Sequence, residues 1–85
     1  MMWRVNVAGP ARKALERFPT LDRERITAAL DEVAVNPFSG DVRKLGPNTY
    51  RRRVGSYRFF FDLYPELHFV QVTAITRRTT TTYRR

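Results

Sequence analysis

The sequence predicts an α+β fold with an N-terminal strand, a helical hairpin and a three-stranded antiparallel meander, in which the two helices pack on one face of the sheet. Three observations lead to this prediction. Runs with the alternating pattern of β-strands stand at the start and throughout the second half of the chain. Two amphipathic segments with helical spacing lie between them. Pro, Gly, Asn and Ser punctuate the segments at their boundaries. With 85 residues, the chain is expected to form a single domain over residues 1–85.

The first strand is predicted from Trp3, Val5 and Val7, which alternate with polar residues. Gly9-Pro10 ends this strand, and proline suits the first position of a helix. The apolar spacing that follows predicts a short helix over Ala11–Phe18.

A second helix is predicted after Pro19. Thr20 is expected to cap it, with Asp22 favourably placed in its first turn. Asn36-Pro37 should end it. Its apolar stripe consists of Ile26, Leu30, Val33 and Ala34. The two helices are therefore expected to form a hairpin.

The second half of the chain is predicted to form a three-stranded antiparallel meander. Phe38–Asn48 reads as a loop, in which Lys44-Leu45 adds a brief extended piece. The strands are expected at Thr49–Val54, Tyr57–Tyr64 and Leu67–Thr76, separated by the turn signals Gly55-Ser56 and Pro65-Glu66.

Charge is distributed unequally along the chain. The net charge is +8, from 16 basic and 8 acidic residues. Residues 1–42 hold six of each, whereas residues 43–85 hold ten basic and two acidic residues, so the whole excess lies in the second half. Fourteen of the basic residues are arginine, which suits bidentate binding of phosphate. A compositional preference for arginine explains the number but not the asymmetry, and a polyanion is the expected partner.

Strand alternation predicts where these arginines point. Arg51 and Arg53 share one face of their strand, and Arg58 and Arg77 are expected to join them on the face opposite the helices. The face toward the helices should carry Tyr50, Arg52, Val54, Tyr57, Phe59, Phe61, Leu63, Val70, Val72 and Ala74, which leaves Ile75 with Arg77.

The chain ends in the segment RRTTTTYRR. Tyr83 among arginines can stack on an unpaired base while Arg78, Arg84 and Arg85 hold phosphates. The alternative is a frayed, solvated terminus, which is common.

The order of elements and three sequence matches resemble the RelE/ParE toxin superfamily over nearly the whole chain. The matches are Lys44-Leu45, the segment YRRRVGSYR at residues 50–58, and Arg77 followed by Tyr83. In the RelE branch the resemblance implies a toxin of a type II toxin–antitoxin pair. Such a toxin is an endoribonuclease that cuts mRNA in the ribosomal A site without metal or cofactor. In the ParE branch it implies an inhibitor of DNA gyrase.

The resemblance to the RelE branch also implies site residues. The catalytic set is Arg51, Arg53, Arg58, Arg77 and Tyr83, and the RNA-binding set is Lys44, Arg52, Arg78, Arg84 and Arg85. An RNA 2′-hydroxyl would attack the adjacent phosphate. Arg58 and Arg77 would clamp that phosphate, while Arg51 and Arg53 would hold the backbone and Tyr83 would orient the nucleotide.

One departure from the RelE pattern leaves other functions open. Arginine occupies both strand positions, and it stays protonated below a pH of about 12, so it is a poor general base. His68 is expected at a turn or on the surface, and Asp62 and Glu66 are poorly placed for catalysis. The ribosome could assist proton transfer. Otherwise the chain is a ParE-like gyrase inhibitor or an inactive nucleic-acid binder.

The resemblance also implies partners and a location. We expect a small acidic antitoxin that forms a hetero-oligomer with this chain, together with the ribosome and mRNA. No segment suits a signal peptide or a membrane span, so a cytoplasmic location is expected.

Overall fold

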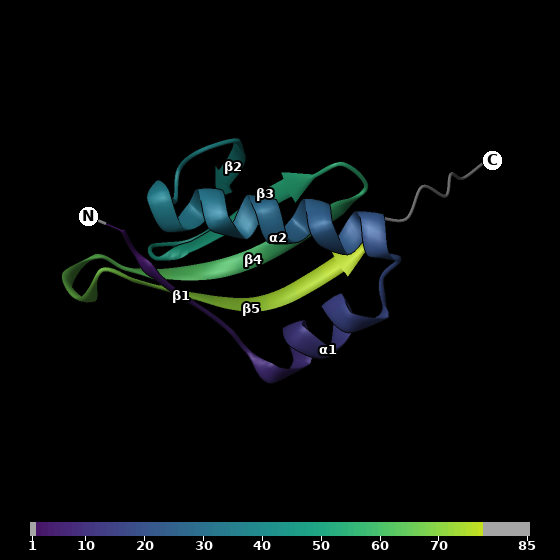
Figure 1. Cartoon of the computed structure of the whole chain (residues 1–85). Helices are drawn as coiled ribbons and strands as arrows, with labels where there is room; N and C mark the ends of the chain where they lie inside the picture. The colour runs from purple at the N-terminus through teal and green to yellow at the C-terminus, as the bar shows by residue number, and fades with distance from the viewer. Residues whose placement is uncertain (1, 78–85) are drawn as a thin grey trace.

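A five-stranded sheet with two helices on one face makes up the fold (Figure 1). The computed structural model describes residues 2–77. The elements are, in chain order, β1 (Arg4–Val7), α1 (Gly9–Arg17), α2 (Thr20–Val35), β2 (Asp41–Lys44), β3 (Thr49–Val54), β4 (Tyr57–Tyr64), the short 3-10 helix η1 (Pro65–Leu67) and β5 (Phe69–Arg77). The predicted α+β class, the helical hairpin and the meander of the last three strands are confirmed.

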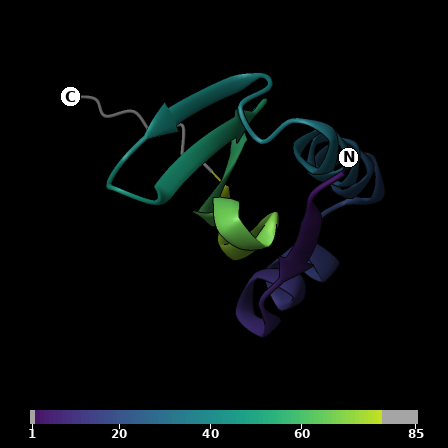
Figure 2. The ribbon, with the colours of Figure 1, turned by 90° about the vertical axis from the view of Figure 1, so that its left-hand side faces the viewer.

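The strands follow the order β1-β5-β4-β3-β2 in the sheet. β1 pairs in parallel with β5, whereas all the other neighbours are antiparallel. The long connection that a parallel pair requires runs from β1 through the helical hairpin and then through β2, β3 and β4 to β5. β2 and β3 therefore lie at one edge of the sheet, and β1 with α1 lies at the other (Figure 2).

The start of α2 differs from its prediction. The helix begins at Thr20, and the N-cap residue is Pro19, which makes no side-chain capping bond. Thr20 is thus not the cap. Its hydroxyl oxygen accepts a hydrogen bond from Nη2 of Arg23 at 3.4 Å instead. The helix ends as expected, with Asn36 as its C-cap.

The predicted loop over Phe38–Asn48 contains a strand, so that prediction is wrong in its middle. Residues 41–44 form β2 and pair with β3 along the edge of the sheet. Only Val42 of this strand is partly buried, so the segment has no apolar alternation that could have identified it. Pairing with the regular neighbour β3, rather than local propensity, makes it a strand.

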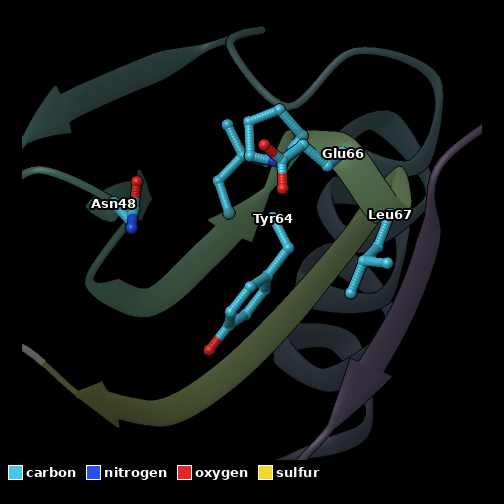
Figure 3. A pocket seen from close by; sticks show the side chains of 6 residues that line it. Asn48, Tyr64, Glu66 and Leu67 are labelled. Atoms are coloured by element: carbon cyan, nitrogen blue, oxygen red, sulfur yellow. The ribbon is translucent and has the colours of Figure 1, made fainter.

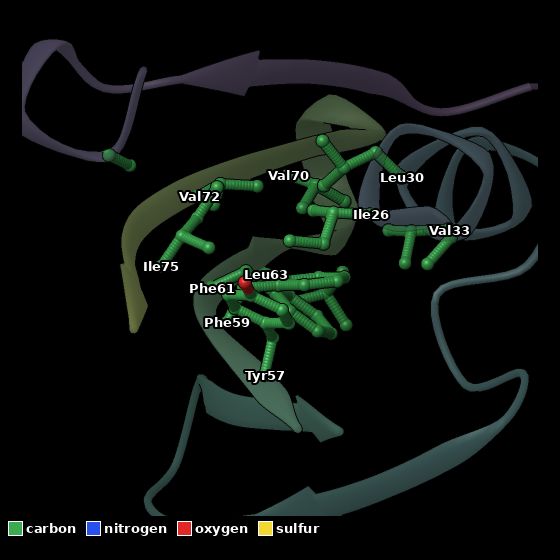
Figure 4. Close-up of a cluster of buried hydrophobic side chains, with 12 residues drawn as sticks. Ile26, Leu30, Val33, Tyr57, Phe59, Phe61, Leu63, Val70, Val72 and Ile75 are labelled. Carbon is green, nitrogen blue, oxygen red and sulfur yellow. The ribbon is translucent and has the colours of Figure 1, made fainter. Parts of the chain in front are cut away.

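Alternation along β4 builds the core beneath the helices (Figure 4). Tyr57, Phe59, Phe61 and Leu63 point toward the helices and are buried, whereas the residues between them are only partly buried. The other buried apolar residues are Ala11, Ile26, Ala29, Leu30, Val33, Val70, Val72 and Ile75. The helices thus cover one face, and the opposite face, which we call the open face, is left for other uses.

A β-bulge in β5 changes which residues face the core. Phe61 pairs with Val72 and Phe60 pairs with Ala74, so Thr73 is an additional residue without a partner on β4. Its hydroxyl donates a hydrogen bond to the Phe60 carbonyl at 3.3 Å. Beyond the bulge, Ile75 is buried and Ala74 pairs with Phe60 on the open face. The prediction that placed Ala74 in the core and Ile75 outside is wrong.

Neither helix in residues 2–77 is long and apolar enough to cross a membrane.

Candidate nucleic-acid interface

Three of the predicted arginines meet on the open face. Arg51 and Arg53 come from β3 and Arg58 comes from β4, where Arg53 and Arg58 are direct cross-strand partners. All three are partly buried. Arg51 pairs with Phe60, so this phenylalanine shares the open face with the three arginines.

A fourth arginine, Arg43, was missed in the sequence. It lies on β2 directly opposite Arg51 and is therefore on the same face. Residues 41–44 read as part of a loop in the sequence, and side chains of a loop cannot be assigned to a face of the sheet. The position of Arg43 therefore could not be predicted. We call Arg43, Arg51, Arg53 and Arg58 the open-face arginine cluster.

The four arginines of the cluster share the open face with two carboxylates, Asp41 and Asp62, so positive charge is in excess there. The cluster's one carboxylate partner within residues 2–77 is Asp41, whose Oδ2 lies 3.8 Å from Nε of Arg53. Both side chains of this pair are well exposed, so the pair adds little stability. Arg53 and Arg58 are like charges placed directly opposite each other, which is unfavourable in a sheet.

Arg51 holds an unsatisfied donor. Its Nε is covered and has no hydrogen-bond partner in the part of the chain that the structure describes. A buried N–H without a partner is costly, so Arg51 holds its place on the open face at some expense in stability. With Phe60 alongside, the cluster offers donors for a phosphate and an aromatic surface for a base.

Arg77 does not join the cluster, and its predicted position is wrong. On β5 the cross-strand partner of Arg58 is Thr76, whereas Arg77 pairs with Tyr57 on the face of the helices. The Arg77 Cζ lies 5.7 Å from the centroid of the Tyr57 ring. The bulge at Thr73 causes this change, because it reverses the alternation for the rest of the strand.

Arg52 also lies away from the open face, on the side that strand alternation predicts. It is buried at 7% exposure, and its Nη2 forms an ion pair with Oε1 of Glu32 on α2 at 2.6 Å. A Cβ atom on Gly40 would lie 2.5 Å from the Arg52 Cζ. The guanidinium therefore joins β3 to α2 beneath Gly40, and this position does not fit the predicted contact with RNA.

The remaining predicted residues lie elsewhere. Lys44 is exposed at the end of β2, opposite Tyr50 and on the face of the helices. Arg78, Tyr83, Arg84 and Arg85 lie outside the described residues.

Tyr57 is the residue against which Arg77 lies. Its hydroxyl donates a hydrogen bond to Oδ2 of Asp22 at 2.8 Å, and its ring packs on Phe18 with centroids 4.5 Å apart. The hydrogen bond to Asp22, with burial and the charge of the same carboxylate, raises the pKa of the Tyr57 hydroxyl above its ordinary value, and Arg77 partly offsets this. Tyr57 is thus held as a neutral donor.

Among the groups that could transfer protons, the carboxylates Asp41 and Asp62 share the open face with the cluster, whereas His68 lies at the far end of β4. His68 lies in the β4–β5 turn with φ of 53°, and its ring stacks on Trp3 with centroids 4.2 Å apart. Asp62 accepts a hydrogen bond from the Thr49 hydroxyl at 2.9 Å. Within residues 2–77, no three His, Asp or Glu side chains gather to hold a metal ion.

A shallow hollow of about 370 Å³ lies at the other end of the sheet from the β3–β4 turn (Figure 3). Its lining consists of Asn48, Leu63, Tyr64, Pro65, Glu66 and Leu67. It contains no basic residue and is separate from the open-face arginine cluster.

The sequence matches no model of a protein family and no curated protein. Its structure is nevertheless similar to those of RelE toxins. An archaeal RelE–RelB complex from Pyrococcus horikoshii matches with a TM-score of 0.83 at 24% identity, over 95% of this chain and 100% of that chain. The RelBE2 toxin–antitoxin complex of Mycobacterium tuberculosis matches with a TM-score of 0.81 at 18% identity, over 92% of this chain and 100% of that chain. Isolated E. coli RelE matches with a TM-score of 0.81 at 20% identity, over 93% of this chain and 87% of that chain.

These likenesses extend over nearly the whole chain and establish the fold. Residues 2–77 have the fold of the RelE toxins, including the two helices on one face of a five-stranded sheet.

Proposed function

Starting from the RelE fold, we propose that this chain is the toxin of a type II toxin–antitoxin pair and acts as a ribosome-dependent endoribonuclease on mRNA. The observation that carries the proposal is the open-face arginine cluster. Arg51, Arg53 and Arg58 lie together on the uncovered side of a RelE-like sheet. Within residues 2–77 these three arginines form one ion pair, the weak contact between Arg53 and Asp41. Such a surface favours a phosphate backbone.

The proposed reaction is transfer of a phosphoryl group within the RNA. The 2′-oxygen forms a bond to the adjacent phosphorus, and the bond from phosphorus to the 5′-oxygen breaks. The products are a 2′,3′-cyclic phosphate and a free 5′-hydroxyl. Negative charge grows on the phosphoryl oxygens, and fixed cations stabilise it more in the transition state than in the ground state.

The proposal gives the members of the cluster different roles. Arg53 and Arg58 are direct neighbours across two strands, which suits a clamp on the scissile phosphate. Arg51 and Arg43 form the next opposed pair and would hold the flanking backbone. Tyr83 remains our proposal for orienting the nucleotide, and Arg78, Arg84 and Arg85 for binding RNA.

Guanidinium groups do not take up the proton of the 2′-hydroxyl, because they stay protonated at neutral pH. We assign that proton, and the one delivered to the 5′-oxygen, to water or to groups of the ribosome. This assignment gives a physical reason why cleavage would depend on the ribosome.

The proposed partners follow from the same surface. The neighbouring structures from P. horikoshii and M. tuberculosis are of toxins in complex with antitoxins. We propose that an acidic antitoxin neutralises the basic half of this chain and that the pair acts in the cytoplasm. Binding of an oppositely charged segment would remove access to the phosphate site.

A short induction of the chain in growing cells, followed by primer extension on an abundant mRNA, tests the function. We expect new 5′ ends at in-frame codon positions that disappear when translation is blocked. The Arg53→Gln/Arg58→Gln double variant should leave the mRNA intact. Absence of such ends with the wild-type chain would refute the nuclease proposal.

A second function, inhibition of DNA gyrase in the manner of ParE, is favoured by one observation. Arg77 and Arg58 lie on opposite faces, so the two arginines of the predicted clamp do not converge. Growth arrest with intact mRNA in the same experiment would support this alternative.

A further inference from the structure

The molecule carries arginines on both faces of the sheet at the β3–β4 turn. On the open face, Arg53 and Arg58 form the last pair but one before the turn. On the face of the helices, Arg77 lies beside Tyr57. The turn, the first part of α2 and the end of β5 lie at the same end of the molecule, at the right of Figure 1.

Arg25 of α2 adds a fourth guanidinium at this end. Its Nη1 lies 3.7 Å from the position that a Cβ atom on Gly55 would occupy. Gly55 has φ of +58° in the tight turn, and Gly55 and Ser56 are both exposed. Only small residues therefore separate Arg25 from the arginines of the open face.

Neither Arg25 nor Arg77 forms an ion pair within the described part of the chain. Within residues 2–77 the ion pairs join Arg52 to Glu32 and Arg53 to Asp41, with no carboxylate oxygen within 4.0 Å of Arg25 or Arg77. Asp22 lies three residues before Arg25 on α2, and its carboxylate accepts the hydrogen bond of the Tyr57 hydroxyl.

We propose that Arg25 and Arg77 form a second phosphate-binding position for RNA on the helix side of the β3–β4 turn. A strand held by the open-face arginine cluster passes over Gly55-Ser56 and places its next phosphates between α2 and the end of β5. The inference rests on the proposed function, because it extends the path of the same RNA.

The surface at this end favours RNA over a protein partner that binds through apolar contacts. Protein interfaces have an apolar centre, yet six of the seven large exposed apolar residues lie toward the other end. These six are Met2, Val35, Phe38, Leu45, Tyr64 and Leu67, and the remaining one is Leu21. The four groups at the turn are all arginine, whose fork suits the oxygens of a phosphate.

The test measures binding separately from cleavage. A labelled 2′-O-methyl RNA oligonucleotide, which lacks the attacking hydroxyl, is titrated with the full-length chain at salt concentrations of about 50 to 200 mM. The variants are Arg25→Gln, Arg77→Gln and Arg51→Gln/Arg53→Gln. Arg4→Gln is the matched control, because Arg4 lies on β1 at the other end of the sheet, where its Cζ is 5.6 Å from the ring centroid of Phe69.

The proposal predicts that Arg25→Gln and Arg77→Gln each reduce the slope of log K against log salt by about 0.7. Each should weaken binding about fivefold at 0.1 M salt, because one phosphate contact is lost. Arg4→Gln should bind like the wild type.

The other outcomes separate this inference from the proposed function. If Arg25→Gln binds like the wild type while Arg51→Gln/Arg53→Gln binds weakly, the second position is wrong and the open-face site stands. If the wild type does not bind the RNA even at low salt, both fail. If Arg25→Gln loses affinity for poly-glutamate but not for RNA, the position serves an acidic protein and our inference is wrong.

Discussion

Three successive arginines, Arg51 to Arg53, show how position on a strand decides what an identical side chain does. Arg51 and Arg53 lie on the open face, where they can bind an anion. Arg52 points the other way and forms an ion pair with Glu32 beneath Gly40. Arg52 therefore contributes to folding. Its two neighbours lie on the open face, where Arg53 is directly opposite Arg58 and the two like charges repel each other.

Replacing Gly40 with alanine should destabilise the protein. Gly40 has φ of +77°, and a new Cβ atom would lie 2.5 Å from the Arg52 Cζ. We expect the free energy of unfolding to fall by about 1–2 kcal/mol from the left-handed backbone alone, and further if Arg52 is displaced. Urea denaturation measures this change.

Gly9→Ala is the matched control for that experiment. A Cβ atom on Gly9 would meet no heavy atom within 4 Å, and no left-handed conformation is required there. The stability of this variant should stay the same or rise by about 0.4–1 kcal/mol. Equal losses for the two alanine variants would contradict the account of Gly40.

Tyr57 should make the stability of the protein fall at alkaline pH. Its hydroxyl donates to Asp22, which raises the pKa of the folded state above that of the unfolded chain. The folded state then binds the proton more tightly. The contribution of Tyr57 to the free energy of unfolding is fully present below a pH of about 10 and is lost as the pH rises through the folded-state pKa of Tyr57.

Urea denaturation at neutral pH and above a pH of about 10 tests this effect in the wild type and in Tyr57→Phe. The phenylalanine variant should lose less stability between the two conditions than the wild type does. Identical losses would show that Tyr57 does not contribute to the pH dependence.

At the scale of the elements, the bulge in β5 has the largest effect on the site. It adds Thr73 to the strand, keeps Val72 and Ile75 both in the core, and turns Arg77 toward the helices. A single extra residue therefore decides which arginines converge.

Two neighbouring substitutions test the bulge. Ile75→Ala should cost about 2–5 kcal/mol, because Ile75 is buried at 4% exposure. Ala74→Ser should change stability by less than about 0.5 kcal/mol, because Ala74 lies on the open face beside Phe60. A regular strand would give the opposite order of effects in thermal or urea denaturation.

The elements that could be predicted from the sequence are those whose own residues carry the pattern. β4 alternates clearly from Tyr57 to Leu63, and both helices have apolar stripes with proline at their starts. β2 could not be predicted, because its pairing with β3 makes it a strand and its four residues carry no alternation. The bulge could not be predicted either, since nothing in VQVTAIT marks which residue lacks a partner.

The same limits decided how much of the site could be predicted. Arg51, Arg53 and Arg58 precede the bulge along the chain and belong to regular strands, so alternation placed them correctly. Arg43 was missed with β2, and Arg77 was misplaced beyond the bulge. Arg25 lies on a helix with charges of both signs, and only the fold brings it to the β3–β4 turn.

At the scale of the whole molecule, charge and apolar surface are separated. Arginines from both faces surround the β3–β4 turn, whereas most large exposed apolar residues lie toward the β4–β5 turn and the end of α2. The described part of the chain thus has an arginine-rich end and an apolar end.

The central claim, that the open-face arginine cluster cleaves mRNA on the ribosome, is tested most directly with purified components. A defined mRNA is bound to ribosomes, and the rate of cleavage is measured with saturating wild-type chain, Arg58→Gln and the control Arg4→Gln. We predict cleavage only when ribosomes are present, with a 2′,3′-cyclic phosphate at the new end. Arg58→Gln should be slower by about 100- to 1000-fold, and Arg4→Gln should match the wild type. A wild-type chain that leaves the mRNA intact, or an Arg58→Gln variant that cuts at the wild-type rate, would contradict the claim.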